Sequence, residues 1–152
     1  MRRSRIVAAR VSRAARFIEL PFLIERYQAL ADSNLAFRNR DAALYYLGWN
    51  LEELSRRKEA AEYFERIRRE FSDSEYWCHA AFALAVWANE AGDYDRAREL
   101  IDAALNHPPD RAILDRLFYV SAKTAMLQER WASARLDFER LLSQCANSPL
   151  RQ

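Results

Sequence analysis

The 152-residue sequence contains only two glycines and four prolines. Tight turns between β-strands draw on both residue types, so the sequence does not favour a sheet protein built on such turns. Both residues also interrupt helices, and their scarcity favours long ones. Apolar residues make up 51% of the chain, which is enough to form the core of one compact domain. The composition therefore predicts an all-α fold.

The residue patterns of common enzymes and metal sites are also missing. His79 and His107 are the only histidines, and no HExxH, GxSxG or CxxC motif occurs. Two glycines cannot build a loop that cradles a phosphate. Cys78 and His79 are adjacent, so on a helix their side chains point about 100° apart, and the sequence supplies no further ligands for a metal. We expect no enzyme activity, no metal and no cofactor.

Long apolar runs are missing too, and none of about 18 residues could span a bilayer. The N-terminus, MRRSRIVAARVSRAARFIEL, is basic like a signal peptide, but Arg10, Arg13 and Arg16 interrupt its apolar residues. Cys78 and Cys145 are too few for a disulfide framework and are expected to be reduced thiols within helical packing. We expect a cytoplasmic protein. A position peripheral to a membrane stays open, with an organelle transit peptide as the lesser alternative.

Charge is unevenly distributed along the chain. Residues 1–40 hold nine arginines and three acids, a net charge of +6, whereas residues 41–152 carry a net charge of −4. A basic N-terminal segment therefore precedes a mildly acidic body.

A repeat appears when the chain is laid on itself with a shift of 37 residues. Small or apolar residues then coincide at positions spaced i, i+4 and i+7, which is one face of a helix. Further small residues coincide upstream and suit a close approach of two helices. We expect two helices per unit, with a small residue of the first facing a small residue of the second. The coinciding sets are Ala60/Ala97/Ala134, Phe64/Ile101/Phe138, Ile67/Ala104/Leu141 and Gly48/Ala85/Ala122.

The signals at the ends of these helices agree with the repeat. Gly92 is expected to end one helix and Asp93 to cap the next, while Pro108 and Pro109 close the second unit. Trp131 is expected to start a helix and to pack between hairpins. The predicted helices are 41–54, 58–71, 75–91, 94–106, 111–128 and 131–144.

These positions resemble the signature of the tetratricopeptide repeat (TPR) family over residues 41–146. In the first unit the signature falls on Leu44, Leu47, Gly48, Leu51, Ala60, Phe64 and Ile67. The chain departs from it at Ser72, Ser121 and Ala146, and its period of 37 exceeds the usual 34. The resemblance implies a right-handed α-solenoid of three helix hairpins, in repeats 41–77, 78–114 and 115–152, whose stacking makes one continuous core.

Two N-terminal segments precede the repeats. Residues 21–40 are expected to form a capping helix, with Leu23, Tyr27, Leu30 and Leu35 on its apolar stripe. Residues 1–20 are predicted to form a basic amphipathic arm that meets an anionic membrane or an acidic partner, or is simply a solvated capping helix. Nucleic acid is not favoured, because only one aromatic residue interleaves with the basic ones. The arginines are Arg2, Arg5, Arg10, Arg13 and Arg16.

The TPR resemblance also implies a groove lined by the first helix of each unit. Aromatic side chains at its exposed positions would anchor a hydrophobic peptide segment. The alternative is that these aromatics belong to the core. The predicted groove residues are Tyr45, Trp49, Phe82, Val86, Asn89, Arg116, Tyr119 and Lys123.

The sequence thus favours a noncatalytic adaptor or assembly factor that binds a protein or peptide. One alternative is a structural subunit of a larger complex, held through the basic arm and the third unit. The other is a small secretion-type chaperone, which the number of TPR-like units behind a helical N-terminus also fits. A homo-oligomer stays open, because nothing in the sequence is expected to cap the third unit.

Overall fold

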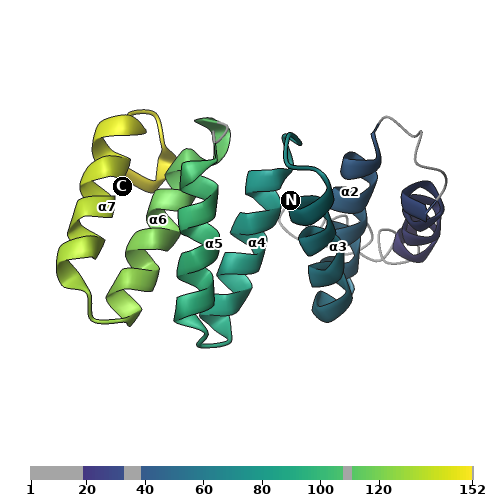
Figure 1. The fold of residues 1–152 in the computed structure, drawn as a ribbon, viewed down its shortest axis with the longest axis horizontal. Helices are drawn as coiled ribbons and strands as arrows, with labels where there is room; N and C mark the ends of the chain where they lie inside the picture. The colour runs from purple at the N-terminus through teal and green to yellow at the C-terminus, as the bar shows by residue number, and fades with distance from the viewer. Residues whose placement is uncertain (1–18, 33–38, 108–110, 152) are drawn as a thin grey trace, which may run out of the picture. The chain divides into compact units, whose positions relative to one another are not determined.

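The computed structural model describes residues 19–32, 39–107 and 111–151 (Figure 1). Residues 19–32 are helical, and six helices and a single 3₁₀ turn follow in the rest of the described chain. No strand occurs in these ranges. The elements are α2 (Arg40–Glu53), α3 (Arg57–Glu70), α4 (Trp77–Glu90), α5 (Tyr94–Asn106), α6 (Arg111–Leu127), α7 (Trp131–Gln144) and η1 (Pro149–Arg151).

The predicted all-α, helical-repeat fold is confirmed, and each helix boundary lies within two residues of its predicted place. Asp93 caps α5 as predicted, because its Oδ1 accepts a hydrogen bond from the Arg96 amide at 3.1 Å. Pro108 and Pro109 lie outside the described residues, as does the basic arm with its five arginines. The chain divides into two compact units, residues 1–67 and 68–152.

The first unit packs the 19–32 helix against α2 and α3. Tyr27 stacks on Tyr46 with ring centroids 5.8 Å apart, and Arg40 Nε donates to the Ala31 carbonyl at 2.7 Å. The predicted apolar stripe of the 19–32 helix is wrong in its phase. Leu23 and Leu30 are exposed, and the buried residues are Leu20, Ile24 and Ala31. Leu35 lies outside the described residues.

Gly48 marks the close approach of α2 and α3. A Cβ atom at this position would lie 2.7 Å from the Phe64 ring, which is fully buried. The expectation that a small residue faces a small one is therefore wrong here. Instead, the missing side chain of Gly48 makes room for an aromatic ring.

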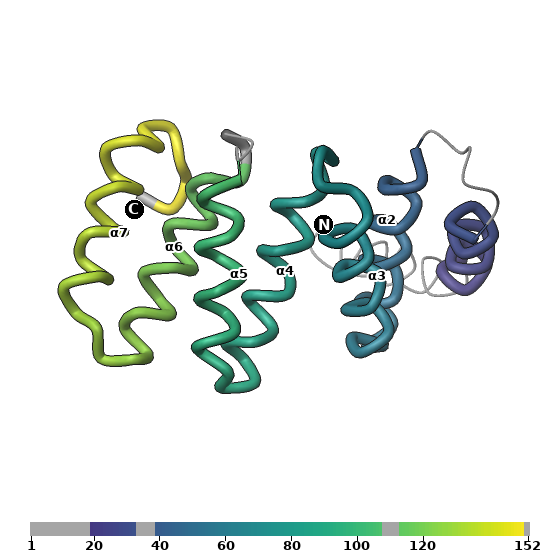
Figure 2. Tube along the Cα trace, viewed as in Figure 1, coloured from purple at the N-terminus to yellow at the C-terminus, as the bar shows by residue number. Residues whose placement is uncertain are grey.

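The second unit contains two hairpins, α4–α5 and α6–α7, and α6 packs on both helices of the first hairpin (Figure 2). One cluster of its core joins α4, α5 and α6. Trp77, Phe82 and Leu105 are partly buried and pack against this cluster. Its buried members are Cys78, Ala81, Ala104, Ile113 and Leu117.

The three hairpin turns share one backbone conformation in the 37-residue register. Ser55, Gly92 and Glu129 have φ angles of 61°, 80° and 59°. In each turn the amide of this residue and the amide after it donate back to carbonyls of the preceding helix, as in a Schellman motif. The left-handed region suits glycine, and only the middle turn has one.

Replacing Glu129 with glycine is expected to raise the free energy of unfolding by about 0.5 to 1 kcal/mol, because glycine adopts this conformation without steric cost. The converse change, Gly92→Ala, is expected to lower it by about 1 kcal/mol. Urea denaturation of the two variants measures both effects. A Gly92→Ala variant with a higher free energy of unfolding would contradict the left-handed conformation of this turn.

Candidate functional site

The main cavity of the second unit has a volume of about 750 Å³ and is lined by residues of α4, α5, α6 and the C-terminal segment. It brings together six of the eight predicted groove residues. Three of them lie on α4 and three on α6. The six are Phe82, Val86, Asn89, Arg116, Tyr119 and Lys123.

The other two predicted residues, Tyr45 and Trp49, lie on α2 in the first unit. Their rings stand 6.0 and 6.1 Å from the ring of Phe64, centroid to centroid. Tyr45 is half-buried and Trp49 is 37% exposed. Tyr45 thus packs partly as a core residue, which is the alternative that the sequence left open for the aromatics.

Two of the predicted groove residues bring aromatic rings to the apolar lining of the cavity. Phe82 on α4 packs against the core cluster on its inner side. Tyr119 on α6 contacts the Phe138 ring edge-on, with centroids 6.4 Å apart. Both rings are therefore held by packing behind them, and little side-chain entropy is lost when something contacts them.

A hydrogen-bonded pair joins α4 to α6 beside the cavity. Asn89 Nδ2 donates to Thr124 Oγ1 at 2.7 Å, and Thr124 Oγ1 donates to the Val120 carbonyl at 2.8 Å. Because the threonine proton goes to Val120, the asparagine must present its NH₂ group to Thr124. Asn89 Oδ1 is then buried without a hydrogen-bond partner in the described part of the chain.

Charged groups of α6 also line the cavity. Arg116 and Lys123 are exposed, and neither side chain has an ion pair within the ranges that the structure describes. Asp115 is engaged internally, since its carboxylate accepts from the Arg116 amide at 2.7 Å and from Ser148 Oγ at 2.6 Å. The two cations lie two helical turns apart on one side of the cavity, about 10 Å along the axis.

The sequence did not predict the C-terminal segment as part of this cavity. Ser148 ties the segment to α6 through Asp115, and Pro149 and Leu150 then line the cavity. Burial raises the pKa of the nearby Cys145 thiol, and the Asp115 carboxylate raises it further, so this thiol stays protonated at neutral pH. Tyr94 of α5 and Leu127 of α6 also line the cavity and were not predicted.

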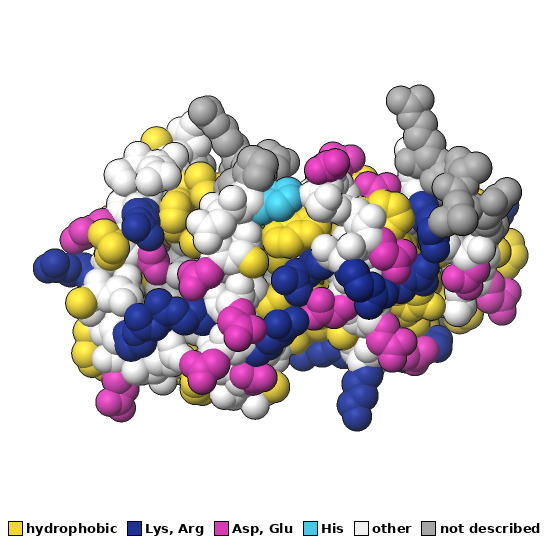
Figure 3. Space-filling model, viewed as in Figure 1, with side chains coloured by type: hydrophobic (Ala, Val, Ile, Leu, Met, Phe, Trp, Pro, Cys, Tyr) yellow, Lys and Arg dark blue, Asp and Glu magenta, His cyan; other side chains and the backbone are white. Residues whose placement is uncertain are grey.

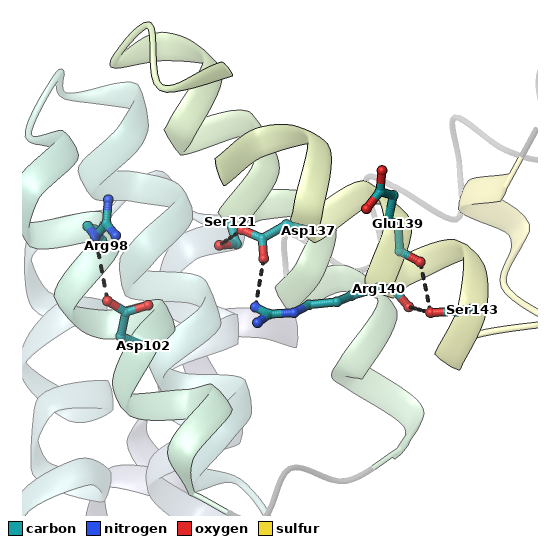
Figure 4. A network of polar contacts seen from close by, with 7 residues as sticks. All are labelled: Arg98, Asp102, Ser121, Asp137, Glu139, Arg140 and Ser143. Atoms are coloured by element: carbon teal, nitrogen blue, oxygen red, sulfur yellow. Dashed lines mark hydrogen bonds and ion pairs between the residues drawn. The ribbon is translucent and has the colours of Figure 1, made fainter. Parts of the chain in front are cut away.

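A second, polar cavity of about 170 Å³ lies among α5, α6 and α7 (Figure 4). Its main buried charge is Asp137, which is 7% exposed. The carboxylate of Asp137 accepts from Ser121 Oγ at 2.6 Å and from Arg140 Nη1 at 3.1 Å. One repeat earlier the same register position holds Leu100, which is buried.

Asp137→Ala is expected to lower the free energy of unfolding by about 1 to 3 kcal/mol, because it leaves Ser121 and Arg140 without their shared acceptor. Asp137→Leu removes the same acceptor but restores the apolar residue of the preceding repeat, so it is expected to be more stable than Asp137→Ala. Thermal and urea unfolding of both variants test this. A leucine variant that is less stable than the alanine variant would contradict this expectation, because apolar packing would then not compensate for the lost hydrogen bonds.

Both histidines take part in structural contacts. His107 stacks on Trp77 with centroids 4.3 Å apart, and its Nε2 lies 2.6 Å from the Ser72 carbonyl. His79 Nδ1 lies 3.3 Å from the Glu75 carbonyl. Across the described residues, no group of three or more His, Cys, Asp or Glu side chains could hold a metal ion. The helices of these same ranges also include none that is long and apolar enough to cross a bilayer.

Residues 42–74, which contain most of α2 and all of α3, match the family model of the tetratricopeptide repeat. The chain is a TPR-like repeat protein. The match covers the first of the three predicted repeats. No curated protein and no solved structure matches the sequence.

A TPR-like repeat is a module for protein–protein interaction, and proteins of this kind are generally noncatalytic. The 37-residue register of the three turns extends the repeat from the matched region into α4–α7.

Proposed function

We propose that this TPR-like protein is a noncatalytic adaptor or assembly factor that binds a hydrophobic peptide segment in the cavity between α4 and α6. The observation that carries the proposal is the placement of six predicted groove residues around one cavity, with Phe82 and Tyr119 as its aromatic wall. Aromatic anchors held by packing behind them are typical of the residues that dominate binding energy.

The size of the cavity favours side chains of a peptide rather than a whole helix. Its volume of about 750 Å³ falls within the range of small-ligand pockets. That space holds a few apolar side chains. The rest of the partner would run along the surface of α6.

The polar groups favour an extended segment with acidic residues. The Asn89 side chain lines the cavity, but its Oδ1 is buried, so the exposed charges of α6 are the polar groups that a peptide can meet. Arg116 and Lys123 would pair with carboxylates of the same peptide. Their separation of about 10 Å along α6 corresponds to about three residues of extended chain.

The test is a selection from a displayed library of random peptides, with the purified full chain as bait. We expect enriched peptides that combine large apolar residues with acidic ones about three positions apart. The same selection is run in parallel with a Phe82→Ala/Tyr119→Ala variant that retains its helical circular dichroism.

Enrichment of these peptides by the parent chain and their loss with the variant would support the proposal. Equal enrichment by both baits would place binding outside the cavity. A parent chain that enriches no peptide class would contradict peptide binding itself.

A further inference from the structure

The flank of α7 formed by Trp131 and Leu142 is exposed to solvent. Trp131 is 62% exposed and Leu142 is 47% exposed. The two residues are eleven positions apart, which brings them to the same side of the helix. The expectation that Trp131 packs between hairpins is therefore wrong within the part of the chain that the structure describes.

The preceding repeat indicates what this flank can do. One register earlier, Trp131 corresponds to Tyr94 and Leu142 to Leu105, both on α5. Leu105 packs against the cluster that contains Ile113 of α6, and Tyr94 lines the cavity that α6 also lines. On α5 this flank is therefore on the side of the helix that faces α6. On α7 the same surface is present without a helix from the described residues.

The charged residues of α7 indicate what kind of surface binds to this flank. Arg135 and Glu139 lie on the same side of α7 as Trp131 and Leu142, and they form an ion pair of 3.6 Å within the helix. Glu139 points away from the Asp137 and Arg140 network (Figure 4). The face drawn in Figure 3 likewise has acidic and basic side chains interspersed.

The exposed flank of α7 is complementary to the same flank of a second copy of the chain. When a second α7 runs antiparallel, with the two-fold axis beside the middle of the helix, Trp131 meets Leu142 of the second copy. In the same register Arg135 meets Glu139 of that copy. Both pairings occur twice by symmetry, as an isologous interface requires. Parallel pairing would instead bring like charges together.

We propose that α7 is a homodimerisation surface, on which a second copy of this chain docks its own α7 in antiparallel orientation. The helix has 14 residues and is about 21 Å long. Its footprint is smaller than the surface of about 800 Å² per partner in a standard stable interface. The dimer is therefore a reversible one that dissociates on dilution.

The test is sedimentation equilibrium of the full chain over a range of concentrations. The weight-average mass should rise from the monomer toward the dimer. Leu142→Ala should weaken the dimer at least tenfold. Leu136→Ala is the matched control, because Leu136 is also 47% exposed but lies on another side of α7, and it should leave the dissociation constant unchanged.

Charge exchange tests the antiparallel register. Arg135→Glu alone should weaken the dimer about tenfold, because it places two acids opposite each other. Arg135→Glu combined with Glu139→Arg should restore the parent dissociation constant. A chain that stays monomeric at all concentrations, a dimer unaffected by Leu142→Ala, or a double exchange that does not restore association would each overturn the proposal.

Discussion

Replacing Phe64 by alanine is expected to lower the free energy of unfolding by about 3 to 5 kcal/mol. Phe64 is fully buried, and the rings of Tyr45 and Trp49 pack around it. Gly48 leaves the space that the ring fills. Gly48 has no side chain that could move into the cavity left by the ring.

Such a loss is a large part of the stability of a small domain. Amide hydrogen exchange of the variant should show α2 and α3 losing protection before the helices of the second unit, because repeats are stabilised mainly by their immediate neighbours. Phe22→Ala is the matched control, since Phe22 is an exposed phenylalanine of the same unit. It should change the free energy of unfolding by less than about 0.5 kcal/mol. Equal losses in both variants would contradict the role given to Phe64.

Tyr119→Ala is expected to weaken binding of a selected peptide about 30-fold, which corresponds to about 2 kcal/mol. The ring lines the cavity and is held from behind by Phe138. Replacing Tyr119 by alanine removes this ring from the apolar lining of the cavity. Isothermal titration calorimetry with a synthetic peptide from the library selection measures the change.

Two further variants make this measurement specific. Tyr119→Phe keeps the ring and should retain most of the affinity. Tyr46→Ala removes a tyrosine that is 45% exposed, against 40% for Tyr119, but lies on α2 outside the cavity. Its affinity should match that of the parent chain. If Tyr46→Ala weakens binding as much as Tyr119→Ala does, the peptide does not bind at the cavity.

Much of the fold could be predicted because the repeat pattern occurs three times in the sequence. Ala60, Ala97 and Ala134 coincide in the register and are buried in the structure. Gly92 indicated the left-handed turn of the second repeat directly. Ser55 and Glu129 adopt the same conformation, but neither residue type signals it, because the shared hydrogen bonds of the turn impose it.

The errors occur where packing depends on a neighbour that the register does not specify. The apolar stripe of the 19–32 helix was predicted on Leu23 and Leu30, since both are large, yet the buried side carries Leu20 and Ile24. A helix with apolar residues all round gives several possible stripes. Which of them is buried depends on the direction from which α2 approaches.

The candidate site likewise has a part that the sequence could predict and a part that it could not. Phe82 and Tyr119 hold equivalent positions in successive first helices, so the sequence could place both on one surface. The C-terminal segment is tied to this surface by the hydrogen bond between Ser148 and Asp115, and no local pattern in the sequence encodes it. The unmet acceptor of Asn89 likewise depends on Thr124, 35 residues away.

A two-dimensional ¹H–¹⁵N NMR titration of the full chain with a selected peptide tests most directly whether the peptide binds between α4 and α6. We expect chemical-shift changes concentrated at Val86 and Asn89 of α4 and at Tyr119 and Lys123 of α6, together with the side-chain amide of Asn89. Changes centred instead on the polar cavity around Asp137, or on the first unit with no effect in α4 and α6, would contradict this expectation.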